Sequence, residues 1–398
     1  MKHPKTILAI LLIVMIGCDR NRQATDAFIT VDVTANYPKK ELVLQDFMDV
    51  EYIALQTCDK FFTQGLVRAV GKEIIVVTNK NLANDGYIYI FDRTGKGIRV
   101  INRRGQGPEE YTRVMNLTLD EDNGELYIVN FRAGRRVNVY DLYGNFKRSF
   151  SFDAGFRGLE NDFNFDNESI ITHNNISILP NREIDLTQPS YFIISKQDGS
   201  RVKDIHIPFE QRRCMHIVKE DNSNSGGATI FLRMPVFPII PYHGSWILTD
   251  PSSDTVFRFF PDYSMTPFMV RTPSIESMRT EVFLFPTILT NRYYFMVTVP
   301  SEIDFEDRIS HLVYDRQQKK IFRHTVLNSD YTIEKPVNMT KRSVNNEIAF
   351  WQIIEVHELV EAYENGHLRG RLKEVAAKLD IEDNPVIMLI KHKQKSKK

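Results

Sequence analysis

Four side chains around a glycine-rich step are the first candidates for ligand contact. Arg103, Arg104, Glu110 and Tyr111 flank the sequence Gly105-Gln-Gly-Pro108. A phosphate-binding loop would need a Lys-Ser/Thr pair and the start of a helix, and neither is present. We therefore interpret the step as a structural turn, with the proline fixing φ and the glycines allowing close backbone approach. The flanking side chains then either contact a ligand or form salt bridges between neighbouring structural units.

A second group of cations, Arg132, Arg135 and Arg136, lies on a predicted hairpin loop. Guanidinium groups bind carboxylates through paired hydrogen bonds, so this loop would suit an acidic glycan. The alternative, which we favour, is a loop whose arginines are simply solvated.

The segment His357-Glu-Leu-Val-Glu361 is similar to the helix motif of zinc hydrolases, but a glutamate stands where the second histidine ligand is needed. No other His or Cys group has the spacing of metal ligands, and the carboxylates are too scattered to nominate an acid and base pair. The sequence therefore predicts no metal site, no cofactor and no catalytic residue.

The amino terminus has the layout of a bacterial export signal. A basic start precedes an unbroken apolar run, Ile7 to Ile16, which is too short to span a membrane as a helix. The sequence Met15-Ile-Gly-Cys18 resembles the bacterial lipobox, in which cleavage exposes a cysteine that carries lipid. We predict a signal peptide over residues 1–17, a lipidated Cys18 and a linker over residues 18–40. This places the protein in the cell envelope, anchored by lipid to the outer membrane, with the periplasmic or surface side left open.

Charge argues against nucleic acid as a partner. The chain has 51 basic and 51 acidic residues, so no overall field attracts a polyanion. The exception is a basic tail over residues 393–398, which we interpret as a solvated end rather than a contact for anionic lipid. Two cysteines remain after lipidation, Cys58 and Cys214. We favour two buried thiols over a disulfide between them, although an exported protein would permit one.

The rest of the chain consists of repeated strand pairs. β-branched and aromatic runs alternate with short polar turns, and the clearest turns carry Asp three residues before Gly, which favours a tight hairpin. The marker aspartates are separated by 49, 57, 64 and 53 positions; they are Asp92, Asp141, Asp198, Asp262 and Asp315. A period near fifty residues is typical of the four-stranded blades of a β-propeller.

The fold class that we predict is all-β: a six-bladed β-propeller over residues 41–392. The alternative is a set of sandwiches that do not close into a ring. We expect Pro385 to His392 to form a strand of the last blade, which both chain ends share so that no sheet edge stays open. Residues 355–380 read as two short helices broken at Asn365-Gly366, inserted into that blade.

With this pattern, the chain resembles the six-bladed β-propeller lipoproteins of Bacteroidota, relatives of the NHL and TolB-like propellers. The lipobox carries the resemblance together with Val50 to Thr57, Ile90 to Gly95, Asn102 to Tyr111 and Asp383 to Met388. One departure is Glu109, which stands where that family often has a second glycine. The resemblance implies fold and location, but little about activity.

Two functions follow as expectations. The first is a monomeric, non-catalytic binding or scaffolding module that engages a glycan or an envelope protein. The alternative is a glycan-active enzyme, a lyase or hydrolase, with its site at the mouth of the central channel.

Overall fold

A computed structural model describes residues 28–80, 85–114, 116–130, 136–151, 162–174, 187–213, 216–221, 228–233, 237–301 and 308–393. The signal peptide, Cys18, Arg132, Arg135 and Cys214 lie outside these residues, so the predictions made for them stay predictions. Within the described ranges, no helix has the length and apolar character needed to cross a membrane.

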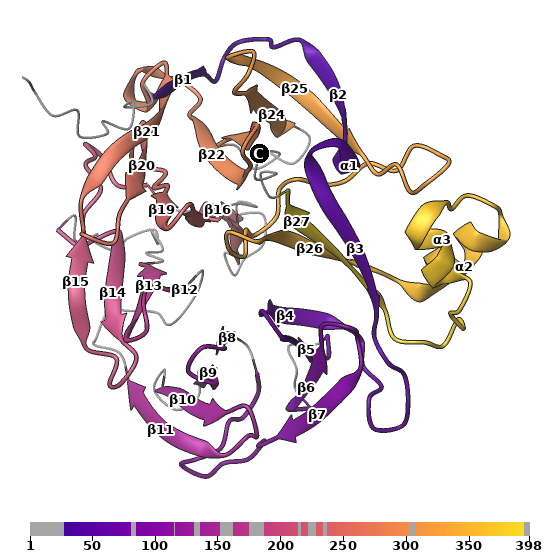
Figure 1. The fold of residues 1–398 in the computed structure, drawn as a ribbon. Helices are drawn as coiled ribbons and strands as arrows, with labels where there is room; N and C mark the ends of the chain where they lie inside the picture. The colour runs from indigo at the N-terminus through magenta and orange to yellow at the C-terminus, as the bar shows by residue number, and fades with distance from the viewer. Residues whose placement is uncertain are drawn as a thin grey trace, which may run out of the picture.

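Six sheets surround a central axis, and the fold is the six-bladed β-propeller that the sequence predicted (Figure 1). We number the blades along the chain. Blade 1 contains β4 (Leu66–Val70), β5 (Ile74–Thr78), β6 (Tyr87–Asp92) and β7 (Gly97–Asn102). Blade 2 contains β8 (Leu117–Asp120), β9 (Glu125–Asn130), β10 (Arg136–Asp141) and β11 (Phe146–Ser151). Blade 3 contains β12 (Phe163–Asn164), β13 (Ser169–His173), β14 (Tyr191–Ser195) and β15 (Arg201–Ile205).

The second half of the ring follows the same plan. Blade 4 contains β18 (Ile239–Tyr242), β19 (Ser245–Leu248), β20 (Thr255–Phe259) and β21 (Met265–Thr272). Blade 5 contains β22 (Val282–Leu289), β23 (Tyr293–Pro300), β24 (Ser310–Asp315) and β25 (Lys320–Leu327). Blade 6 contains β26 (Ile348–Ile354), β27 (Val386–His392) and β3 (Met48–Ala54). A short 3-10 helix, η2 (Ile275–Ser277), links blades 4 and 5.

The amino-terminal segment adds a strand to three successive blades. β1 (Ile29–Asp32) pairs in parallel with β21, and β2 (Lys39–Val43) pairs in parallel with β25. After the single turn α1 (Leu44–Phe47), β3 pairs antiparallel with β27, so the chain ends share the last blade as predicted. The predicted linker needs correction, because β1 and the start of β2 lie within it. Each of these strands is short, and its partner lies more than 200 positions away in the chain.

The marker aspartates close hairpins between the two outer strands of their blades. In blade 1, the Asp92 carboxylate accepts hydrogen bonds from the main-chain N–H groups of Thr94 (2.8 Å) and Lys96 (3.0 Å). Gly95 adopts φ +89°, and a Cβ there would lie 2.1 Å from the carbonyl oxygen of Ala54 in blade 6. Only glycine therefore fits this turn without a shift of the neighbouring blade.

The hydrophobic core is distributed around the ring, with one cluster of buried side chains at each of the six borders between blades. The middle strands are covered on both faces, and every residue of β5, β9 and β13 is buried. This explains why the apolar residues of these strands are consecutive rather than alternating, as in Ile74 to Val77 of β5.

The helical insertion is confirmed. α2 (Val356–Glu364) and α3 (Gly370–Ala376) lie between β26 and β27 in the chain, and Gly366 separates them with φ +69°. Leu359 and Leu372 are buried in the cluster at the border of blades 5 and 6. The helices therefore cover the outside of the ring and do not enter its channel (Figure 1).

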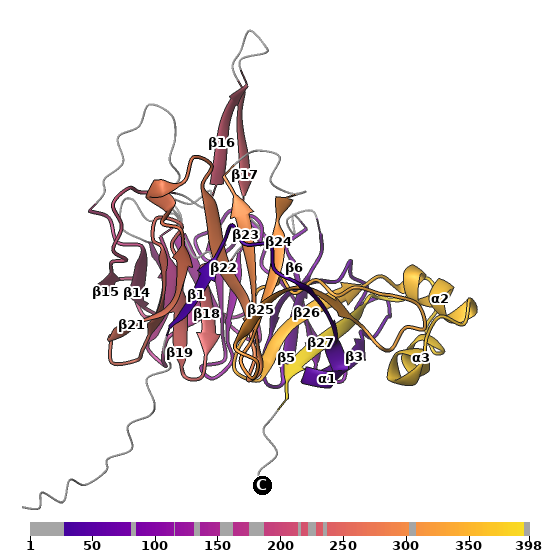
Figure 2. The same ribbon diagram turned by 90° about the horizontal axis from the view of Figure 1, so that it is seen from above.

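The ring has two distinct ends. We call the end with the turns of Asp92, Asp141 and Asp262 the hairpin end. The opposite, connection end carries the segments that join one blade to the next, such as residues 103–116. From this end the hairpin of β16 (His216–Asp221) and β17 (Ala228–Arg233) projects away from the ring (Figure 2).

Candidate functional site: the central channel

The central channel holds a cavity of about 500 Å³ that opens at the hairpin end. Blades 1, 2, 3, 4 and 6 all contribute inner strands or turns to its wall. The side chains that the following argument uses are Arg68, Phe163, Phe165, Trp246, Arg342 and Trp351. The volume lies within the range of small-molecule sites, about 300–1000 Å³.

Aromatic rings form one wall of the cavity. The ring of Phe165 stacks on Trp246, with centroids 4.5 Å apart, and Tyr263 stacks on the other side of Phe165 at 5.9 Å. Trp246 is 7% exposed, so this stack fixes it rigidly, whereas Trp351 is only partly buried. Trp246 and Trp351 are the two tryptophans of the whole sequence, and both line this cavity.

A second cavity of about 570 Å³ lies toward the connection end and is lined in part by Asn338, Lys341 and Gln352. Arg342 and Trp351 line both cavities. We call this pair the channel waist. Any group held there can be approached from either end of the ring.

Two guanidinium groups reach the channel. Nε of Arg68 donates to the Thr78 hydroxyl (2.8 Å), and Nη2 of Arg342 donates to the main-chain oxygen of Asp162 (2.6 Å). The Arg342 guanidinium also lies 4.8 Å from the centroid of the Phe163 ring. Burial lowers the pKa of both arginines, which marks the channel as a place where a cation is poorly hydrated.

The carboxylates of Glu121 and Asp122, at the mouth of the channel, already have hydrogen-bond or ion-pair partners. Glu121 accepts hydrogen bonds from the main-chain N–H groups of Glu73 (2.8 Å) and Ile74 (3.1 Å). Asp122 pairs with Lys72 at 2.5 Å. These contacts join the inner turns of blades 1 and 2, so they shape the mouth.

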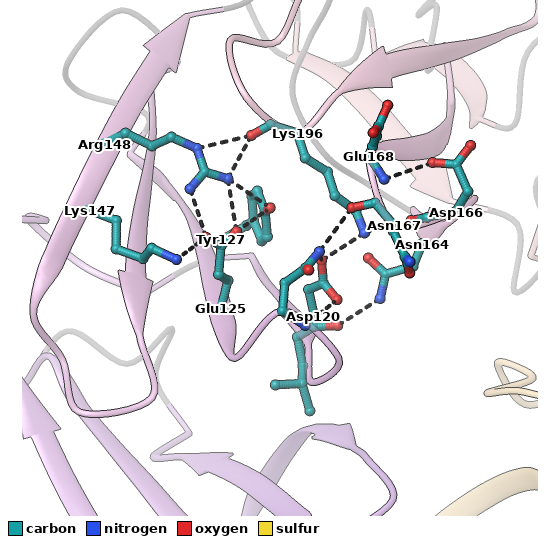
Figure 3. Close-up of polar contacts among 12 residues, drawn as sticks. Asp120, Glu125, Tyr127, Lys147, Arg148, Asn164, Asp166, Asn167, Glu168 and Lys196 are labelled. Carbon is teal, nitrogen blue, oxygen red and sulfur yellow. Dashed lines mark hydrogen bonds and ion pairs between the residues drawn. The ribbon is translucent and has the colours of Figure 1, made fainter.

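A polar network at the border of blades 2 and 3 holds the aromatic wall in place (Figure 3). Lys196 pairs with Asp120 at 2.7 Å and donates to the main-chain oxygen of Asp166. Nδ2 of Asn164 donates to the Leu119 oxygen at 3.1 Å. Because Asn164 stands between Phe163 and Phe165, this bond fixes both rings against blade 2.

Glu125 anchors the outer part of the same network. Nη1 and Nη2 of Arg148 donate to its two carboxylate oxygens at 2.7 and 2.8 Å. Burial alone would raise the pKa of Glu125, but the hydrogen bonds from Arg148, Lys147 and Tyr127 outweigh it and lower the pKa to about 2. The carboxylate is thus a structural anion.

The four candidates of the glycine-rich step lie at the connection end. Tyr111 is buried; its hydroxyl donates to the Gly86 oxygen (2.8 Å) and accepts from the Arg103 main-chain N–H (3.0 Å). Burial raises the pKa of this hydroxyl. Nε of Arg103 donates to the Gly144 oxygen of blade 2 at 2.7 Å, and Arg104 is exposed. In the geometry observed, Tyr111 and Arg103 therefore tie structural elements together.

The glycine-rich step lies in the segment that connects β7, the outer strand of blade 1, to β8, the inner strand of blade 2. Glu110 accepts a hydrogen bond from the Gly107 N–H at 2.8 Å, and a Cβ on Gly105 would overlap its carboxylate. Nη2 of Arg136 donates to the Pro108 oxygen, so the structure brings Arg136 to this step. Ligand contact by these side chains stays a prediction.

The structure also shows the positions of the His357 segment and of Cys58. His357, Glu358 and Glu361 lie on the exposed face of α2, and the described part of the chain shows no group of three His, Cys, Asp or Glu residues arranged to hold a metal. Cys58 is exposed in the segment between β3 and β4, so the expectation of a buried thiol there was wrong. That segment runs over the surface of the ring.

The channel residues were missed by sequence reasoning. Arg68, Phe163, Trp246 and Arg342 lie on four different blades, and no local motif connects them. One signal was available: the sequence has two tryptophans, and each of them follows a short polar turn.

Comparison with solved structures finds the same fold. A Bacteroides fragilis protein, provisionally described as an exported protein, aligns with a TM-score of 0.56 at 13% identity, covering 92% of this chain and 100% of that one. A DUF4221-family protein from Bacteroides vulgatus aligns at 0.47 and 10% identity, covering 88% and 100%. Virginiamycin B lyase from Staphylococcus aureus aligns at 0.36 and 12% identity, covering 86% and 99%. The last two likenesses support no further argument.

Comparison with curated proteins finds no match. The model of one protein family, the domain of unknown function DUF4934, matches residues 28–391, from the residue before β1 to the end of β27. The chain therefore belongs to the DUF4934 family, whose fold in this member is a six-bladed β-propeller.

Proposed function

We propose that this protein is a cell-envelope binding module that holds a glycan in the cavity of its central channel. The observation that carries the proposal is the gathering of both tryptophans, Phe163 and Phe165 around one cavity that also contains two arginines. Flat aromatic faces pack against the C–H faces of sugar rings, and a few polar groups set the orientation of a bound ligand. The protein acts as a monomer in this proposal.

Rigidity supports binding at this cavity. Trp246 is held by the Phe165 stack, and the segment that carries Phe163 and Phe165 is fixed by the hydrogen bond of Asn164 to blade 2. A wall that is already ordered loses little conformational entropy when a ligand binds.

The two tryptophans provide the experiment. Intrinsic tryptophan fluorescence is followed while the purified domain is titrated with trisaccharides. The neutral trisaccharides are maltotriose, mannotriose and chitotriose, and the acidic ones are trigalacturonate and trimannuronate. We expect a saturable change with at least one of them. Trp351→Ala should weaken that binding about fivefold, the value of one aromatic contact. The matched control is Phe62→Ala, since Phe62 is 63% exposed and lies outside the cavity.

Two results would change the proposal. No fluorescence change with any glycan would favour a protein partner at the envelope. Mass spectrometry of the bound glycan after long incubation should show it intact, and shortened or unsaturated products would replace binding by a lyase or hydrolase activity.

We also propose that the mature protein is anchored through lipid on Cys18 at the outer membrane. The similarity to an exported Bacteroides protein supports a cell-envelope location. Because β1 runs parallel to β21, Phe28 lies at the hairpin end of the ring, the end at which the cavity opens. Mass spectrometry of the mature amino-terminal peptide tests the anchor, and an unmodified Cys18 would contradict it.

A further inference from the structure

We infer that the glycan held in the channel is acidic and that its carboxylate binds the guanidinium of Arg342 at the channel waist. This inference rests on the glycan-binding function proposed above and names the class of sugar that the cavity selects.

Arg342 has unused hydrogen-bond capacity. A guanidinium carries five N–H donors, and within the described residues that of Arg342 makes one hydrogen bond, to the Asp162 main-chain oxygen. The Asp162 carboxylate acts on Arg342 electrostatically but is not within ion-pair distance, and it accepts a hydrogen bond from the Thr118 hydroxyl instead. Among the residues that the structure describes, the Arg342 guanidinium is therefore a partly buried cation with no ion-pair partner.

Two other arginines that are partly or fully buried are paired with carboxylates. Arg148 holds Glu125 through two hydrogen bonds, and Arg212 lies 3.2 Å from Asp250, where both side chains are 3% exposed. Burying a charge without a partner is costly, so an exception at the centre of the channel points to a ligand. A carboxylate fits best, because it meets a guanidinium with two parallel hydrogen bonds.

A second polar group, in the second cavity beside the waist, also lacks a partner. Oε1 of Gln352 is buried and has no hydrogen-bond partner among the described residues. Gln352 lines the cavity that Arg342 and Lys341 also line. A sugar acid offers both kinds of group that these side chains need, because its carboxylate accepts from the cations and a hydroxyl can donate to the amide oxygen.

The acidic side chains of the mouth do not oppose this assignment. Glu121 caps a main-chain turn and Asp122 is paired with Lys72. Asp162 also lines this cavity, and its carboxylate accepts a hydrogen bond from the Thr118 hydroxyl. Arg342 and Lys341 together place two cations at the second cavity, against this one carboxylate.

The test compares trigalacturonate with its fully methyl-esterified form, which keeps the sugar rings and removes the charge. Wild-type protein should bind the acid at least about tenfold more tightly than the ester, as one charge-assisted contact predicts. Arg342→Gln should lose this preference while keeping its affinity for the ester. The control is Arg371→Gln, because Arg371 is 66% exposed on α3, away from the channel. It should bind like wild type.

The outcomes separate the two proposals. If acid and ester bind wild type equally, or if Arg342→Gln keeps the preference, the assignment of Arg342 is wrong while glycan binding stands. If no glycan binds at all, the proposed function fails, and this inference fails with it. Thermal unfolding shows whether Arg342→Gln folds. If Arg342→Gln does not fold, Arg342→Lys is tested instead, because lysine keeps the positive charge but loses the paired donors. The preference of this variant for the acid over the ester should fall severalfold. An unchanged preference would overturn the inference.

Discussion

The ammonium group of Lys196 in blade 3 lies 2.7 Å from the carboxylate of Asp120 in blade 2, and the two side chains are 5% and 3% exposed. This pair crosses the border between blades 2 and 3, where Asn164 also bonds to blade 2 (Figure 3). Breaking a buried ion pair leaves one charge without a partner, which is costlier than losing an exposed pair.

We expect Lys196→Met to lower the free energy of unfolding by about 3–5 kcal/mol, because Asp120 would stay buried and uncompensated. The matched change is Lys72→Met, since Lys72 and Asp122 are 66% and 61% exposed. That variant should lose less than about 1 kcal/mol. Urea unfolding measures the free energy of unfolding of both variants. Equal losses of stability would show that burial of the Lys196–Asp120 pair does not add to its contribution.

The pKa of Glu125 predicts how the stability of the folded protein depends on pH. Its pKa in the folded protein is about 2, below its ordinary value of 4.5, so folding favours the charged form. The stabilisation is complete above pH 4.5 and is lost as the pH falls toward 2.

At pH 7 we expect Glu125→Gln to be less stable than wild type by about 2 kcal/mol. The difference between the two proteins should shrink steadily in urea unfolding experiments between pH 4.5 and pH 2.5. A difference that stays constant over this range would contradict the role of the ionised carboxylate.

Gly95 should be far less tolerant of a side chain than Gly124. Both have positive φ, but a Cβ at Gly95 meets the Ala54 oxygen at 2.1 Å, whereas nothing lies within 4 Å at Gly124. Gly124→Ala should cost about 1 kcal/mol for the backbone alone. Gly95→Ala should cost about 3 kcal/mol or more, because blade 6 must shift. Thermal unfolding measures the stability of the two variants. Similar losses of stability would mean that blades 1 and 6 move apart easily to accommodate the side chain.

β1 provides a test of the amino-terminal strands within the ring. Val31 is fully buried against blade 4, while its neighbour Thr30 is exposed. Val31→Asp should destabilise the protein by about 4 kcal/mol, since it buries an unpaired charge. Thr30→Asp should change stability by less than about 0.5 kcal/mol. If both variants unfold like wild type, β1 does not contribute to the fold in solution.

Local sequence features predicted the repeating part of the fold. The turn at Asp92 is defined by side chain to main chain hydrogen bonds over four residues, and the closing strand Val386–His392 begins with five consecutive apolar residues. Both signals lie within short windows of the chain. β1 and β2 could not be predicted in this way, because their sequences become strands only through pairing with β21 and β25.

The residues that line the channel could not be predicted from the sequence, for a related reason. Arg342 and Phe163 are 179 positions apart, yet the ring places the guanidinium over the aromatic face. Tyr111 illustrates the same limit: it stands beside a conspicuous glycine-rich step, and its ring lies in the buried cluster between blades 1 and 2. Proximity in the chain was a poor guide to which side chains share a cavity.

The strands contributed by residues 29–54 also constrain the order of assembly. They are synthesised first, yet β1, β2 and β3 pair with strands that end at residues 272, 327 and 392. Since synthesis adds about 5–20 residues per second, the first segment must wait many seconds for its partners. In the part of the chain that the structure describes, the strands of blades 1, 2 and 3 pair only with strands that are close in sequence, so these blades can fold as they emerge. Completion of the ring depends on the synthesis of β27.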